Sequence, residues 1–183
     1  MLSAKVRVAV RLAAVATLAA LTAGCFHPMY AEHSDGSPGL REKLETVDIP
    51  PVDKPNASRE ARVGVEIRNA LAFKLYGNAT GAPPLYHLVL RFTSGRSSLM
   101  VNVNTGLPSS ENYGIDAQFN LVEIATNKSV MTGTTFARVS YDMPGSYQRF
   151  ARERAFRDAE DRAAQEIADN INTRLASYFS TGS

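Results

Sequence analysis

Apolar and polar residues alternate along three consecutive segments in the middle of the chain, and each alternation predicts a β-strand. The first covers residues 86–103, where Ser94-Gly95 predicts a bulge. The others cover residues 113–121 and 130–141. Because residues 125–128 form a short turn between these two, we expect an antiparallel meander.

A helix is predicted over residues 57–76, because its apolar residues recur every three or four positions. Asn56 or Ser58 is expected to cap its start, and Gly77 to end it. Before this helix, residues 45–49 alternate weakly and are followed by two prolines, which predicts a short first strand.

The last segment predicts a long helix capped by Ser146, with an apolar residue at every fourth position from Tyr147 to Phe179. Such a helix approaches about 50 Å, whereas a ten-residue strand spans only about 33 Å. We therefore expect the half around Ile167 and Leu175 to pack on the sheet. The charged half, residues 149–162, is expected to overhang the sheet or to bend.

The element order is β-α-β-β-β-α. It predicts an α+β fold, a two-layer sandwich with two helices packed on one face of a four-stranded, mostly antiparallel sheet.

The N-terminal segment has the form of a secretory signal. Its basic residues are followed by an apolar run over residues 12–21, too short for a membrane-spanning helix. We expect residues 1–24 to be removed as a signal peptide, residues 25–44 to form the mature N-terminus and a tether, and residues 45–183 to form one domain.

Charge and cysteine content narrow the class of protein. The formal charge of +2 becomes −1 for residues 25–183, because the three basic residues of the leader are its only charges. With no dense basic run, nucleic acid is not expected as a partner. Cys25 is the only cysteine, so no disulfide is expected. It is either a buried, inert thiol or a site of modification.

The residues before Cys25 resemble a bacterial lipobox, with Ala23 and Gly24 at the small positions. This resemblance implies cleavage before Cys25 and acylation of its thiol and its new amino group. Two or more acyl chains would anchor the protein stably in a membrane.

Three further patterns are together similar to the LptE family of lipopolysaccharide-assembly lipoproteins. They are the mature start at residues 25–30, the strand and turn at 113–133, and the end of the chain from Ser140 through Asp158-Ala159-Glu160 to Phe179. The resemblance implies a non-enzymatic lipoprotein anchored in the outer membrane and facing the periplasm and a barrel lumen. Its implied partners are lipopolysaccharide and an LptD-type β-barrel. The family member plugs this barrel, helps it to assemble, and helps it to deliver lipopolysaccharide to the outer leaflet.

Lipopolysaccharide carries phosphates, which arginine side chains bind well. The lipopolysaccharide-binding candidates are Arg91 and Arg96, on either side of the expected bulge, and Lys128 at a hairpin tip. The alternative is that each is an ordinary surface charge.

No enzyme motif is present. The three histidines, at positions 27, 33 and 87, lack the spacing of metal ligands, and no cofactor fingerprint occurs. We expect no catalytic residue, metal or cofactor. Two other classes remain open: an auxiliary lipoprotein of an ABC-type lipid transporter and, less favoured, a periplasmic lipid hydrolase.

We predict that Cys25→Ser abolishes acylation and membrane retention and leaves the fold intact, because only the anchor is lost. Membrane fractionation of cells that lack the barrel partner measures this. Continued fractionation of the variant with outer membranes would contradict the tether.

Overall fold

The computed structural model describes residues 38–77, 82–101, 106, 108–143 and 148–181. The chain divides into two units, Met1–Gly39 and Leu40–Ser183, and the described helices and strands all belong to the second unit. The expected signal peptide, Cys25 and the expected helix cap Ser146 lie outside the described residues.

Three long strands dominate the sheet and confirm the expected meander. They are β2 (Tyr86–Val101), β3 (Pro108–Glu123) and β4 (Lys128–Asp142). The sheet order is β1-β2-β3-β4, with antiparallel neighbours except for the short β1 (Val47–Asp48), which pairs parallel to β2.

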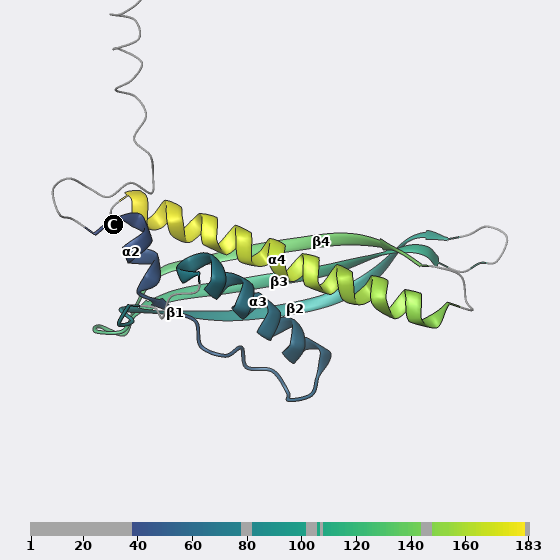
Figure 1. The fold of residues 1–183 in the computed structure, drawn as a ribbon, viewed down its shortest axis with the longest axis horizontal. Helices are drawn as coiled ribbons and strands as arrows, with labels where there is room; N and C mark the ends of the chain where they lie inside the picture. Colours follow the sequence, from purple (N-terminus) through teal and green to yellow (C-terminus); the bar gives the residue numbers. More distant parts are fainter. Residues whose placement is uncertain (1–37, 78–81, 102–105, 107, 144–147, 182–183) are drawn as a thin grey trace, which may run out of the picture. The chain divides into compact units, whose positions relative to one another are not determined.

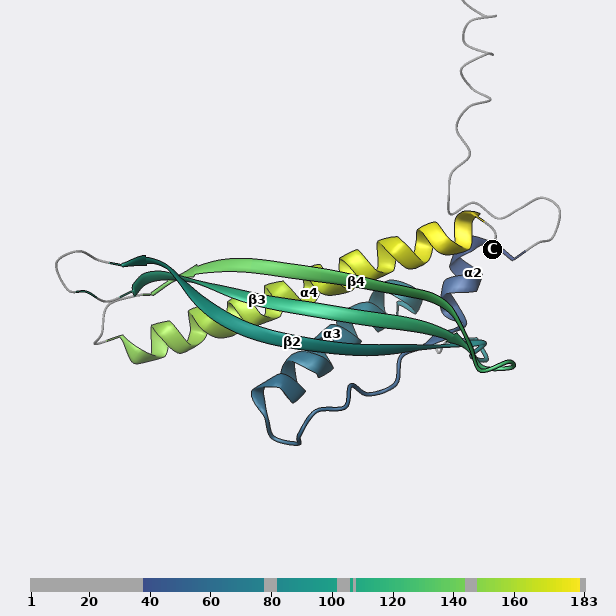
Figure 2. The ribbon, with the colours of Figure 1, turned by 180° about the vertical axis from the view of Figure 1, so that it is seen from behind.

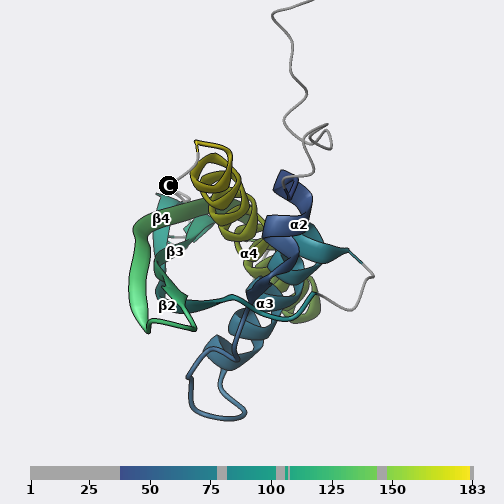
Figure 3. The same ribbon diagram turned by 90° about the vertical axis from the view of Figure 1, so that its left-hand side faces the viewer.

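The helices lie on one side of this sheet, as the views from opposite sides show (Figures 1 and 2). They are α3 (Arg59–Tyr76), α4 (Arg149–Thr181) and the short α2 (Leu40–Glu45). The end view shows the sheet curving around α4 (Figure 3). The α+β two-layer fold is therefore confirmed. Helix α2 is not predicted by the sequence pattern. Five of its six residues belong to the segment expected to be a tether, residues 25–44, and its Leu40 and Leu44 are buried.

Local signals set the ends of α3. The amide of Ala61 donates a hydrogen bond of 3.0 Å to the Ser58 hydroxyl, so Ser58, not Asn56, is the N-cap. At the other end Gly77 has a φ of 62°, and its amide donates to the Phe73 carbonyl. A side chain would be strained at that φ, which explains a glycine there.

The side chains that face the helices form one hydrophobic core. All five expected residues of β3 are buried, namely Tyr113, Ile115, Ala117, Phe119 and Leu121. On β4, Gly133 lies opposite Phe119, and a Cβ at Gly133 would lie 2.5 Å from the Phe119 ring. The glycine therefore leaves room for the phenylalanine to lie across the neighbouring strand.

The expected bulge at Ser94-Gly95 is wrong. These residues pair without interruption with Ile115 and Gly114, and the register shifts only between Ser98 and Val101. Ser94 and Gly95 are therefore regular residues of β2. The shift in register lies near the end of the strand, close to the hairpin with β3.

The charged half of α4 does not overhang the sheet as a whole, although none of residues 149–155 is buried. Phe156, Ala159 and Glu160, all in the half expected to project, are buried. The error lies in the strand length, because β2 and β3 each have 16 residues. At about 3.3 Å per residue they extend about 50 Å, and the 33 residues of α4 reach the same length at about 1.5 Å each.

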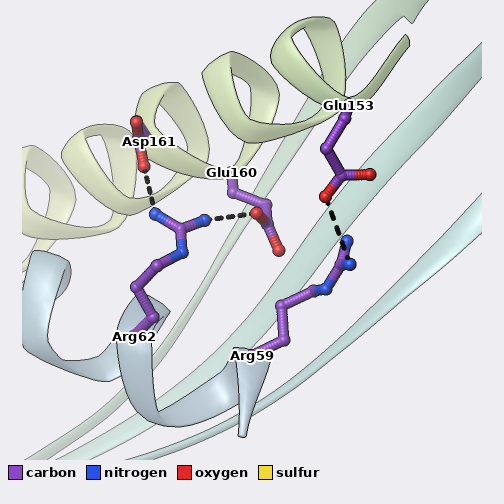
Figure 4. A network of polar contacts seen from close by, with 5 residues as sticks. All are labelled: Arg59, Arg62, Glu153, Glu160 and Asp161. Carbon is purple, nitrogen blue, oxygen red and sulfur yellow. Dashed lines mark hydrogen bonds and ion pairs between the residues drawn. The ribbon is translucent and has the colours of Figure 1, made fainter. Parts of the chain in front are cut away.

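Ion pairs join α3 to α4 (Figure 4). Arg62 donates to Asp161 at 2.8 Å and also contacts Glu160, while Arg59 lies 3.4 Å from Glu153. Glu160 is the buried member, with 2% of its surface exposed. Its second carboxylate oxygen has no hydrogen-bond partner among the described residues.

Burial raises the pKa of Glu160 above its ordinary value of 4.5, because loss of hydration outweighs the attraction of Arg62. The folded state therefore holds this proton more tightly than the unfolded chain does. The contribution of Glu160 to the free energy of unfolding is therefore fully present below about pH 4.5. It is lost as the pH rises through the pKa that Glu160 has in the folded state.

We predict that Arg62→Met lowers the free energy of unfolding by about 3 kcal/mol at pH 7, because it leaves a buried carboxylate without its cation. The loss should shrink at pH 4.5, which is below the raised pKa of Glu160, and should largely disappear when Glu160→Gln is added. Urea unfolding at both pH values measures this.

The matched control is Arg157→Met, which removes an exposed α4 arginine without an ion pair among the described residues. We expect a change within about 0.5 kcal/mol. Equal losses for the two variants, or a loss for Arg62→Met that does not depend on pH, would contradict a role for the buried pair.

Candidate functional site

The sheet face turned away from the helices is the main candidate site. Strand alternation that buries apolar residues on one face places their neighbours on the other. Many of those neighbours carry hydroxyl or amide side chains. They include Thr93, Gln118, Asn120, Thr132 and Thr134. The open face is thus rich in groups that both donate and accept hydrogen bonds.

Two adjoining depressions mark this face. One, of about 320 Å³, is lined by residues of all three long strands, among them Arg91, Asp116 and Phe136. The other, of about 570 Å³, extends toward Val89 and Asn120 and includes Arg174 of α4. Both contain Arg91, Gln118 and Thr134, which are register partners across β2, β3 and β4.

A charged and aromatic cluster lies beside the depressions. Both carboxylate oxygens of Asp116 accept from Arg138, at 2.7 and 2.9 Å. Arg138 lies across Gly114, where a Cβ would be 2.9 Å from the arginine side chain, and its guanidinium is 5.5 Å from the centre of the Phe136 ring. Phe136 is 64% exposed, so a large apolar ring stands among polar side chains on this face.

Of the three expected cation sites, only Arg91 belongs to these depressions. Arg96 is five residues farther along an uninterrupted strand, and residues an odd number apart lie on opposite faces. Without the expected bulge between them, Arg91 and Arg96 therefore lie on opposite faces of the sheet.

Arg96 lies against the aromatic side chains of the core and not in the depressions. Its guanidinium is 4.8 Å from the centre of the buried Phe156 ring, and that of Arg59 is 4.6 Å from it. Tyr113 and Tyr141 pack against the same ring, with centroids 5.5 and 5.6 Å away. Burial, together with a hydrogen bond to Glu111, raises the pKa of Tyr141 to about 12. Arg96 thus helps to close the core at this end of the sheet.

Lys128 is exposed at the first position of β4, directly after the turn. Its register partner Glu123 pairs in turn with Tyr86. Along the strands, Lys128 is therefore about 17 Å from the level of Arg91 and about 33 Å from that of Arg96. The structure does not gather the three cations into one site.

Arg138, Asp116 and Phe136 are functional candidates that the sequence does not single out. Arg138 and Asp116 are 22 residues apart, and only the pairing of β3 with β4 brings them together. One signal was available: Phe136 interrupts a run of polar residues on the exposed face of the predicted third strand.

Two further kinds of feature are absent from the described residues. No cluster of histidine, cysteine, aspartate or glutamate in that part of the chain could hold a metal ion. None of the described helices combines the length and apolar character needed to span a membrane.

Comparison with solved structures supports the fold. A candidate lipoprotein from Caulobacter crescentus superimposes with a TM-score of 0.60 at 21% identity, covering 79% of this chain and 97% of its own. Rare lipoprotein B from Shewanella oneidensis superimposes with a TM-score of 0.51 at 17% identity, covering 74% of this chain and 96% of its own. At these identities the likeness establishes the fold alone.

Sequence comparison supplies the family. No curated protein matches the chain. The family model for lipopolysaccharide assembly, LptE, matches residues 44–175, which cover β1 to β4, all of α3 and most of α4. The matched part is well over half of the chain, and its predicted element order is the one the structure has. The chain therefore belongs to the LptE family of lipopolysaccharide-assembly proteins.

Proposed function

We propose that this protein is an outer-membrane lipoprotein that plugs and helps to assemble an LptD-type β-barrel and assists lipopolysaccharide insertion, without being an enzyme. Family membership carries the role in lipopolysaccharide assembly. Acylation at Cys25 would hold the domain at the membrane through the segment between Cys25 and α2.

The polar open face is the observation that favours a barrel lumen as the environment of the domain. A barrel with a polar interior offers hydrogen-bond partners rather than an apolar wall. Threonine, glutamine and asparagine side chains on the open face can exchange water for such partners at little cost. In this proposal the open face lies against the barrel, with Phe136 as its apolar anchor.

Lipopolysaccharide contact is a second part of the proposal. Arg91 is the best placed of the three candidates, because it lies in both depressions beside hydroxyl and amide groups. Lys128 is exposed and can contribute at the hairpin end, whereas the guanidinium of Arg96 is engaged with Phe156.

We predict that Phe136→Ala weakens the complex with the barrel by about 2 kcal/mol, or roughly 30-fold in Kd, as for a central aromatic side chain of an interface. Affinity co-purification of the tagged, full-length protein from outer membranes, followed by titration of the purified barrel, measures this. A stable one-to-one complex is expected for the unmodified protein.

The control is Phe73→Ala on α3, where the ring is exposed to nearly the same extent, 66%. Equal effects of the two variants would argue against the open face as the contact surface. Co-purification of an inner-membrane transporter in place of a barrel would favour the auxiliary-lipoprotein class and overturn the proposal.

We predict that replacing Arg91, Arg96 and Lys128 together by alanine lowers binding to purified lipopolysaccharide by at least about tenfold, equivalent to about 1.4 kcal/mol. Among the single variants, Arg91→Ala should have the largest effect and Arg96→Ala should mainly lower the melting temperature. Unchanged binding by the folded triple variant would remove these residues from the lipopolysaccharide site.

A further inference from the structure

The two edges of the sheet differ in how their main-chain groups are covered. An uncovered edge strand presents a row of unpaired N–H and C=O groups, and proteins usually cover or disrupt such rows. At the β4 edge, α4 supplies the cover. Asn170 donates to the Phe136 carbonyl and Arg162 to the Ser140 carbonyl, each at 3.4 Å.

The β2 edge is covered over only part of its length. Strand β1 pairs with Tyr86 and His87, and the Lys54 side chain donates to the Phe92 carbonyl at 2.8 Å. These contacts also give the strand's orientation: the main-chain groups of even-numbered β2 residues point outward. Those of Ser94, Arg96 and Ser98 therefore lie on the free edge.

Beyond Phe92 this edge is open and regular. Pairing with β3 continues without a register shift as far as Ser98. Within the described part of the chain, no hydrogen bond reaches the outward main-chain groups of Ser94, Arg96 or Ser98. A Cβ at Gly95 would meet no atom within 4 Å, so the open face beside this edge is also uncovered at Gly95. No proline interrupts residues 93–99, so another strand can approach this part of β2.

We propose that the β2 edge from Thr93 to Leu99 is a strand-addition site for an extended, acidic segment of the barrel partner. This rests on the proposed function for the existence of that partner. Main-chain hydrogen bonds would supply the affinity, as in other complexes formed by strand addition.

The charge of the edge favours this occupant over a second copy of the chain. Strand β2 contains Arg91 and Arg96 and no acidic residue, and Lys54 lies beside it. Antiparallel pairing of two copies over residues 93–99 would set Arg96 against Arg96, and like charges directly opposite each other are destabilising. An acidic segment would instead neutralise the edge.

Ser98→Pro tests the site in the full-length protein. Proline removes the outward N–H and places its ring on the edge, and edge positions with a solvent-facing N–H accept proline without breaking the inner ladder. Ser98→Ala, the matched control, keeps the N–H. We expect Ser98→Pro to reduce the co-purified barrel at least about tenfold, or about 1.4 kcal/mol, and Ser98→Ala to change it less than about twofold.

A second measurement does not depend on how well the proline variant folds. A photo-crosslinking amino acid in place of Ser98 should join the protein to an extended, acidic segment of the barrel, identified by mass spectrometry. Crosslinks to a second copy, or none while the barrel still co-purifies, would overturn the strand-addition site alone. So would undiminished retention by folded Ser98→Pro. Failure of the unmodified protein to retain any barrel would overturn the proposed function, and this inference with it.

Discussion

Cover for the apolar face of three long strands is the constraint on which this fold depends. Helix α4 meets it because its 33 residues and the 16 residues of β2 or β3 have nearly the same length, about 50 Å. The buried positions of α4 are largely alanine in its first half and larger aliphatic residues in its second. Small side chains let the helix come close to α3 and to the sheet, and the ion pairs of Arg62 then join the two helices where little apolar surface is available.

Covering only one face leaves the other in contact with water or with a partner. That face can be polar because antiparallel strands need a core on only one side. Its hydroxyl and amide groups, its two depressions and the exposed Phe136 are consequences of the same layering. The sheet edges follow a similar logic, since α4 lies near enough to β4 to cap its carbonyls, whereas β1 is too short to cover β2.

The arginine and lysine side chains of this domain make different kinds of contact, which the residue type alone does not predict. Arg62 neutralises the buried Glu160, Arg59 and Arg96 lie against the Phe156 ring, and Arg138 holds Asp116 on the open face. Arg91 and Lys128 are free of such contacts among the described residues. The surface available to an anionic ligand is therefore smaller than the number of basic residues implies.

Local patterns in the sequence determined the four strands and the two long helices and most of their buried positions, but not the short helix α2. Alternation in residues 113–121 specifies the buried face of β3, and Ser58 and Gly77 specify the ends of α3, because these effects act over a few neighbouring residues. The family resemblance also followed from the order of local patterns and is confirmed. Strand length, register and the helix-to-sheet match depend on pairing between distant segments, so only the tertiary structure decided them. Arg62 and Glu160 are 98 residues apart, and the faces of Arg91 and Arg96 depend on whether β2 bulges between them. Neither relation is encoded in a pattern of neighbouring residues, because both arise from the free energy of packing the whole sheet against α3 and α4.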